Sequence, residues 1–225
     1  MKSKLIVTLL LSIVIVSSTW AKERPEVKCV LTLNDGKTVE GWFLKEGFST
    51  YGPDRLKNVD EITITPTKDG KEGTTYKADD VKVLKCIYEK EGLQKEYRSL
   101  YALKPMTRPL NLKHSNHKFF WMVGYQGKKV IGFISDASVI FRTSATERLI
   151  SKTMAYSYCV EGDEVVVTYY APSGGIDIGS KSELKMNFER FPEMVELIKS
   201  KDFSVKEMKA KPFAMLETLD QYLAK

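Results

Sequence analysis

The sequence has 225 residues and a formal charge of +6, with 35 basic and 29 acidic residues interleaved along the chain. Only seven of the basic residues are arginines, and no basic run is longer than two residues. Proteins that bind nucleic acid concentrate basic residues in one patch, and arginine recognises planar anions better than lysine. The composition therefore argues against nucleic acid as a partner, and the length is enough for one large domain or two small ones.

The first 21 residues have the pattern of a secretory signal peptide. Lys2 and Lys4 precede an apolar stretch over residues 5–16, and small residues lead from there to Ala21. This stretch is too short to span a membrane as a helix. We expect cleavage after Ala21, export to the periplasm or the medium, and no membrane span in the remaining chain; a retained N-terminal anchor is the alternative. Removing residues 1–21 leaves 204 residues and a formal charge of +4.

Residues 22–104 have the pattern of an N-terminal β-rich region. Strand patterns at residues 27–33 and 38–44 flank Asp35-Gly36, and Asp-Gly between two strand patterns is among the strongest hairpin signals. Further strand patterns follow at residues 62–65, 74–77 and 81–88. Short strands separated this closely by turn residues predict a small barrel or a rolled sheet.

Three stretches of the chain resemble a family of exported proteins. They read LTLNDGKTVEGW (residues 31–42), YKADDVK (residues 76–82) and FPEMVELIK (residues 191–199). Through these motifs most of the chain after residue 21 is similar to an uncharacterised family of signal-peptide-bearing proteins of Bacteroidetes-type bacteria. The turn of that family is of a Gly-Asp-Thr type, whereas this chain has Asp-Gly-Lys-Thr. The resemblance implies an exported location, an opening hairpin and a helical C-terminus, and it implies no active site.

The segment 104–109 is the best candidate for a boundary, because its two prolines interrupt any helix or central strand. It separates the N-terminal region from a C-terminal region, residues 105–225, which is predicted to contain β-hairpins followed by helices. That the two regions form one continuous domain is the alternative.

The densest apolar run after the signal peptide covers residues 119–134. It is predicted to fold back at Gln126-Gly127 as a two-residue hairpin turn, since glycine accepts the positive φ of such turns. In that register Trp121 lies opposite Gly132, so that an aromatic ring covers the bare backbone of a glycine. Apolar side chains on both faces predict an interior hairpin.

The C-terminal region changes its period near Ser180. A second hairpin is predicted from residues 156–160 and 165–170. After Ser180, which with Glu183 forms a capping-box pattern, apolar residues follow a helical spacing. They are Leu184, Phe188, Phe191, Val195 and Ile198, and then Phe213, Leu216, Leu219 and Leu223. Pro192 is predicted to divide the first group into two helices, and a last helix is predicted to begin near Pro212.

Two interpretations remain open for the segment between the hairpins. Residues 144–147 read Ser-Ala-Thr-Glu, a capping-box pattern that would open a short helix, or the whole segment 135–153 is a mobile loop. In either case the fold class is predicted as α+β and β-rich. Antiparallel hairpins form a small barrel or rolled sheets, and helices follow at the C-terminus.

The three cysteines are Cys29, Cys86 and Cys159. An odd number leaves one thiol free even in an oxidising compartment. Because all three lie in strand patterns, we expect buried, unpaired thiols that pack as small apolar residues, with a Cys29–Cys86 bridge as the alternative.

Three groups of residues are candidates for catalysis or metal binding. His114 and His117 have an H-x-x-H spacing, but they follow a proline-containing linker and have no acidic ligand near them. Cys159 would need a histidine to act as a nucleophile, and it lacks any local signature of a catalytic cysteine. The acidic groups are Asp79-Asp80 and, at a predicted hairpin tip, Glu161, Asp163 and Glu164. We assign no catalytic residue, metal or cofactor from these patterns.

Aromatic residues give the remaining functional signal. Tyr156, Tyr158, Tyr169 and Tyr170 fall on one predicted hairpin, where they would either bind a partner or build a core. By exclusion we predict a non-enzymatic cell-envelope protein that binds a glycan or another envelope protein through these tyrosines. The alternative is a hydrolase that acts on an envelope polymer with Asp or Glu as acid and base. Convergent carboxylates in a cleft would favour the hydrolase.

Overall fold

The computed structural model describes residues 27–43, 60–89, 92–104, 107–136, 139–142, 148–151, 154–172 and 177–225. The strands are β1 (Val27–Leu33), β2 (Thr38–Phe43), β3 (Glu61–Thr65), β4 (Thr74–Lys77), β5 (Val81–Tyr88), β6 (Leu93–Leu103), β7 (His114–Gln126), β8 (Val130–Asp136), β9 (Val139–Arg142), β10 (Arg148–Ser151), β11 (Met154–Val160), β12 (Val165–Pro172) and β13 (Asp177–Ile178). The helices are α1 (Lys181–Asn187), α2 (Pro192–Lys199), α3 (Val205–Ala210) and α4 (Ala214–Leu223), with 3₁₀ turns η2 (Ala78–Asp80) and η3 (Pro109–Asn111).

The strands form one large sheet that closes on itself in its middle. Its order is β13-β12-β11-β8-β7-β6-β5-β1-β2-β3-β4, while β9 and β10 pair separately. β12 also pairs in parallel with the end of β6, where Val165 lies opposite Tyr101. This pairing closes β6, β7, β8, β11 and β12 into a five-stranded barrel. The predicted α+β class, with a small barrel and C-terminal helices, is confirmed.

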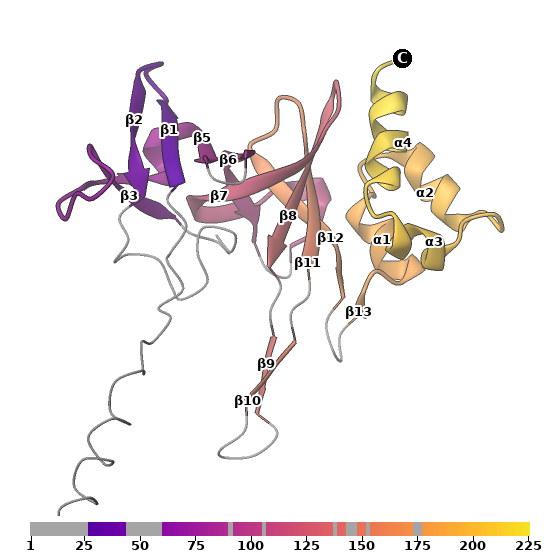
Figure 1. Ribbon diagram of the computed structural model, residues 1–225. Helices are drawn as coiled ribbons and strands as arrows, with labels where there is room; N and C mark the ends of the chain where they lie inside the picture. Colours follow the sequence, from indigo (N-terminus) through magenta and orange to yellow (C-terminus); the bar gives the residue numbers. More distant parts are fainter. Residues whose placement is uncertain are drawn as a thin grey trace, which may run out of the picture.

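β6 belongs to both parts of the sheet. Its first half pairs with β5 and its last residues pair with β12, while β7 lies along its other edge. Figure 1 shows the result as three layers, with β1–β3 on one side, the barrel strands in the middle and the four helices on the other side. The predicted boundary at residues 104–109 falls in the connection between β6 and β7, which are paired strands.

A first hydrophobic core, the N-terminal core, packs on one face of β1, β5 and β6. Side chains alternate between the two faces of a strand, so Cys29 and Leu31 on β1 face Cys86 and Leu84 on β5 in direct register. Tyr97 and Phe120 join it from β6 and β7; its other buried members are Val27, Phe43, Ile62, Ile64, Ala78, Val81 and Tyr88.

The opposite face of β6 and β7 points into the barrel. Trp121, Phe133, Cys159 and Val166 fill the interior, and Trp121 Nε1 donates a hydrogen bond of 3.0 Å to the carbonyl oxygen of Leu100. β7 is therefore apolar on both faces, which confirms the prediction of an interior hairpin. Because side chains fill a barrel of this size, a ligand can reach it only at its ends.

A second large core, the helix-side core, lies between the helices and the outer faces of β8, β11 and β12. Its buried members are Val130, Tyr158, Val167, Tyr169, Tyr170, Leu184, Phe188, Met194, Ile198, Met208, Met215, Leu216 and Leu219. α1 begins at the predicted capping box of Ser180 and Glu183, and Pro192 opens α2 at its first turn, so the predicted division of the stripe is confirmed. α3 was not predicted; its N-cap is Ser204, whose hydroxyl accepts from Glu207 N.

The β7–β8 hairpin differs from its prediction in register. Tyr125, not Trp121, lies opposite Gly132, because the chain reverses later than predicted, between Gln126 and Val130. A bulge between Val123 and Tyr125 then shifts the pairing farther from the turn by one residue. Gly124, at this bulge, faces the α4 side: a Cβ there would lie 2.6 Å from the ring of Phe213. The connection is a three-residue loop, and Gly127 has no positive φ. The predicted two-residue primed turn is therefore wrong.

Two sequence predictions fall outside the described residues. The signal peptide, residues 1–21, is one, and the capping-box pattern at residues 144–147 is the other.

Candidate functional site

The four tyrosines that we expected to form a binding face lie in the helix-side core. Tyr158, Tyr169 and Tyr170 are buried, and Tyr156 is half-buried and stacks on Tyr170 with ring centroids 5.7 Å apart. The structure therefore corrects the prediction of an exposed tyrosine patch. The physical reason is that the helices bury their apolar faces against this hairpin, and the tyrosines fill the core between them.

The hydroxyl groups of two of these tyrosines attach the barrel to the helical layer. Tyr158 donates to the carbonyl oxygen of Asn187 at 2.7 Å, and Tyr169 donates to that of Pro212 at 2.9 Å. Burial raises the pKa of both phenols, so both remain protonated donors at neutral pH. Each bond satisfies a polar group that burial would otherwise leave unpaired.

The histidines do not form a metal site with the residues around them. The His114 ring packs on Tyr101 with centroids 4.2 Å apart, and its Nδ1 lies 2.8 Å from the carbonyl oxygen of Ser115. His117 Nδ1 lies 3.9 Å from Asp79, on the surface. Among the residues that the structure describes, no group of three histidine, cysteine or acidic side chains could hold a metal ion.

The three thiols are buried and unpaired, which confirms the prediction. Cys29 and Cys86 lie directly opposite each other on β1 and β5. Burial raises the pKa of Cys159 to about 12, so this thiol is protonated at neutral pH and is a poor nucleophile.

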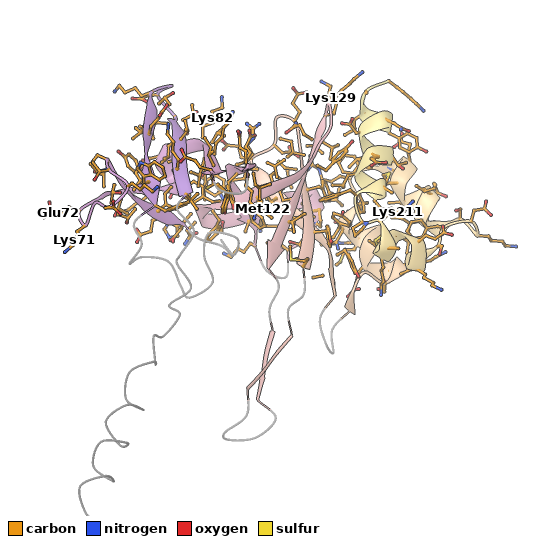
Figure 2. All side chains as sticks on the ribbon, in the orientation of Figure 1. Lys71, Glu72, Lys82, Met122, Lys129 and Lys211 are labelled. Carbon is orange, nitrogen blue, oxygen red and sulfur yellow. The ribbon has the colours of Figure 1, made fainter. Side chains whose placement is uncertain are left out.

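The best candidate site is a pocket of about 650 Å³ at one end of the barrel, which we call the barrel-end pocket. It lies where the β7–β8 turn and the β11–β12 loop meet the strands of the barrel, and Asn34 of the β1–β2 turn and Lys82 of β5 also line it. Its charged lining residues are Lys82, Arg98, Lys118, Lys128, Lys129, Glu161, Asp163 and Glu164; its neutral polar ones are Asn34, Ser99 and Gln126. Leu100, Val130, Ile131 and Cys159 provide its apolar surface. Figure 2 labels Lys82 and Lys129 in the upper part of the view, Lys82 beside the N-terminal strands and Lys129 near the tip of the β7–β8 hairpin.

Helix α4 holds the β7–β8 turn in place through Asp220. The carboxylate accepts hydrogen bonds from the backbone N–H groups of Lys128 (3.0 Å), Lys129 (2.6 Å) and Val130 (2.9 Å). A Cβ at Gly127 would lie 2.5 Å from the Asp220 carboxylate, so only glycine permits this approach. Burial alone would raise the pKa of Asp220, but the three hydrogen bonds outweigh it and hold that pKa below its ordinary value.

The three carboxylates of the β11–β12 loop are each paired with a cation. Glu161 lies 2.6 Å from Lys129 and Glu164 lies 3.0 Å from Lys118. Asp163 lies 2.6 Å from Arg190, and the side chain of Asp163 is less exposed than those of Glu161 and Glu164. Gly162, with φ of 89°, provides the positive φ that this tight loop needs. These ion pairs fix the loop against the hairpin and the C-terminal region.

Sequence reasoning named the acidic loop but not the pocket. The basic residues of the pocket are spread from β5 to the β7–β8 turn and follow no spacing. Strand pairing places Lys82, Arg98 and Lys118 on neighbouring strands, and only the folded barrel adds the β7–β8 turn to the same pocket. The one local signal was Gly127, whose role at Asp220 depends on a residue more than 90 positions later in the chain.

A second hollow, of about 680 Å³, lies where η3 meets α1 and α2. Leu110 and Met186 are exposed on its wall. Arg108 pairs with Glu189 at 2.9 Å, so the charged groups here attach η3 to the end of α1. The barrel-end pocket has more convergent polar groups and is the better candidate.

The helices of the described part of the chain are all too short or too polar to cross a membrane. Comparison with protein-family models, with curated proteins and with solved structures found no match to this chain.

Proposed function

We propose that this protein is an exported, non-enzymatic binding module of the cell envelope, which holds a glycan or a segment of a partner protein in the barrel-end pocket. The observation that carries the proposal is the convergence of polar side chains from six separate segments around this pocket, above a filled barrel. Ligand sites of small molecules have volumes of about 300–1,000 Å³ and a few placed polar groups, and this pocket has both properties.

The hydrolase alternative is favoured by one observation, the presence of three carboxylates in the pocket. A glycosidase needs one carboxyl group that donates a proton and a second that is free to attack or to activate water. Here each carboxylate lies within 3.0 Å of a basic side chain. Such pairing favours a structural role for these acids, and therefore supports binding over hydrolysis.

The envelope location rests on the N-terminal pattern, two lysines followed by a short apolar stretch that ends at Ala21. Fractionation of the producing cells, followed by mass spectrometry of the protein's N-terminal peptide, tests this part. We expect a mature protein that begins at Lys22 and is found outside the cytoplasm. Retention of Met1 in a cytoplasmic protein would contradict it.

Binding is tested by titrating soluble fragments of envelope polysaccharide into ¹⁵N-labelled protein and following the amide resonances. We expect the largest shifts at residues 126–131 and 161–164, with the added fragments recovered intact. Largest shifts at Leu110 and Met186 would place the site in the second hollow and contradict the proposal. Appearance of shorter fragments would favour the hydrolase, and Glu161→Gln and Glu164→Gln would then identify the acid and the base.

A further inference from the structure

We infer, on the basis of the proposed function, that the group recognised in the barrel-end pocket is an oxyanion, a carboxylate, phosphate or sulfate carried by the ligand. Lys82, Arg98 and Lys128 are the residues that would hold it. This inference names the ligand's chemistry, whereas the proposed function names only the pocket.

The charge of the pocket is not balanced within the protein. Five basic and three acidic side chains line it. Lys118 and Lys129 have carboxylate partners in the β11–β12 loop, and Asp163 is neutralised from outside the pocket by Arg190. Lys82 and Lys128 have no ion-pair partner among the described residues. An excess of positive charge therefore remains in a concave site, which concentrates anions.

Arg98 provides a second, independent observation. One terminal nitrogen of its guanidinium pairs with Glu96 at 2.8 Å, outside the pocket lining. Its Nε is buried and donates to no group of the described protein. Nε itself is closed to a ligand, but the Arg98 side chain keeps about 30% of its surface exposed in the lining of the pocket, where the rest of its guanidinium can meet an anion. An oxyanion is the acceptor that the fork of an arginine fits best.

Lys128 lines the pocket from a turn that helix α4 holds in place. Its backbone N–H is fixed by Asp220, and so are those of the next two residues, Lys129 and Val130, which leaves the side chain as the free part of a rigid turn. Asp220 attracts the charge of Lys128, but its carboxylate oxygens already accept the three backbone hydrogen bonds of the turn. A positive side chain on a preorganised turn loses less conformational freedom on binding than one on a free loop.

The test uses two trisaccharides that differ mainly in charge, trigalacturonate and maltotriose, together with inorganic phosphate as a third probe. Each is titrated into the full-length protein by calorimetry, and amide shifts locate the site. We expect trigalacturonate or phosphate to bind with shifts at residues 126–131 and 161–164, and maltotriose to bind at least about tenfold more weakly, because each lost charge-assisted contact has that effect. Affinity should fall as salt rises, since exposed charges are screened over about 10 Å at 0.1 M.

The variant for this test is Lys82→Gln with Lys128→Gln, and its control is Lys71→Gln with Lys211→Gln. Both pairs remove the same charge, and Figure 2 labels Lys71 and Lys211 at opposite sides of the molecule, away from Lys82 and Lys129. We expect the first pair to weaken binding of the anion by about tenfold or more, and the control pair to change it by less than about twofold. Arg98→Lys, which keeps the charge but loses the fork, should weaken it as well.

The outcomes separate the two proposals. Equal binding of maltotriose and trigalacturonate in the pocket overturns the oxyanion inference and leaves the proposed function standing. Equal losses in the two lysine pairs overturn it too, because the effect would then be one of net charge. Binding of phosphate but not of trigalacturonate supports the oxyanion and assigns it to a phosphorylated ligand. No binding of either anion overturns the inference, and shifts confined to the second hollow overturn the proposed function as well.

Discussion

The barrel is attached differently to its two flanks. On the N-terminal side, β5 continues the hydrogen-bond ladder of β6, so the N-terminal core and the barrel share one backbone network. On the other side no such ladder joins α1–α4 to the barrel among the described residues, and side chains make the attachment: stacked rings, two tyrosine hydroxyls and Asp220.

This difference has a consequence for how the two flanks respond to substitution. A backbone ladder depends on strand register and tolerates many side chains, whereas a side-chain attachment depends on a few residues. The helical layer should therefore be the flank that a single substitution can release. The barrel-end pocket depends on that layer, because Asp220 holds its turn.

The largest expected effect comes from Phe188→Ala. Phe188 is fully buried and stacks on Tyr158 with ring centroids 5.0 Å apart. We expect a loss of about 3–5 kcal/mol, against about 2–5 kcal/mol for the matched core change Leu84→Ala on the N-terminal side. Hydrogen exchange should show α1–α4 losing protection in the first variant while β1–β5 keep theirs, and all strands weakening in the second. Identical exchange patterns in the two variants would remove the distinction between the flanks.

A somewhat smaller effect is expected for Asp220→Ala, which leaves three backbone N–H groups of the β7–β8 turn without their acceptor. We expect a loss of about 1–3 kcal/mol in urea denaturation. Glu217→Ala, one turn earlier on the exposed side of α4, is the control and should cost less than about 0.5 kcal/mol. Equal losses of stability in the two variants would mean that the hydrogen bonds between Asp220 and the β7–β8 turn do not stabilise the fold.

The same residue predicts a pH dependence. The folded-state pKa of Asp220 lies below its ordinary value of 3.8, so its contribution is present above pH 3.8 and is lost as the pH falls through the folded-state pKa. The difference in Tm between the wild type and Asp220→Ala should therefore be constant near neutral pH and shrink below pH 3.8. A difference that grows on acidification would contradict this sign.

Two glycines sharpen the comparison between the flanks. Gly36 in the β1–β2 turn has φ of 85° and open space around it, so Gly36→Ala costs only backbone strain, about 1–2 kcal/mol. Gly127→Ala places a Cβ against Asp220 and should cost about 1–3 kcal/mol. Combined with Asp220→Ala, the Gly127 change should cost less than it does alone, whereas the Gly36 change should be additive. Additivity in both double variants would refute the close contact.

The smallest expected effect is that of a reducing agent. Cys29 and Cys86 are neighbours in the N-terminal core but are free thiols, so reductant should leave Tm unchanged. A native bridge contributes about 2–5 kcal/mol, which would shift Tm by several degrees. A shift of that size would show that the bridge forms in the native protein.

The parts of the fold that were predicted correctly depend on local signals. Asp35-Gly36 defined the first hairpin, Ser180 with Glu183 defined the start of α1, and Pro192 defined the start of α2. Each signal acts through backbone groups within four residues, so neighbours in sequence suffice to read it.

The errors depend on contacts between distant segments. The register of Trp121 was missed because the chain reverses at residues 127–129, where the backbone of the turn binds Asp220, about 90 residues later in the chain. The tyrosines of β11 and β12 were expected on the surface because the sequence pattern of a hairpin is the same whether or not helices cover its outer face. The pocket could not be predicted, since Lys82 and Lys128 approach each other only through the closed barrel.

The parallel pairing of β12 with β6 also sets an order for folding. The residues that it joins, Tyr101 and Val165, lie about 60 residues apart in the chain, so closure must overcome a large loop entropy that the antiparallel hairpins avoid. β1–β7 can pair while the rest of the chain is still emerging. The barrel must wait for β12, and the tyrosine face of β11 and β12 must wait longer still, until α1–α4 arrive to cover it. A chain that folds as it is synthesised from its N-terminus would therefore present an uncovered aromatic surface until its last helices emerge, and it would be most prone to aggregate at that stage.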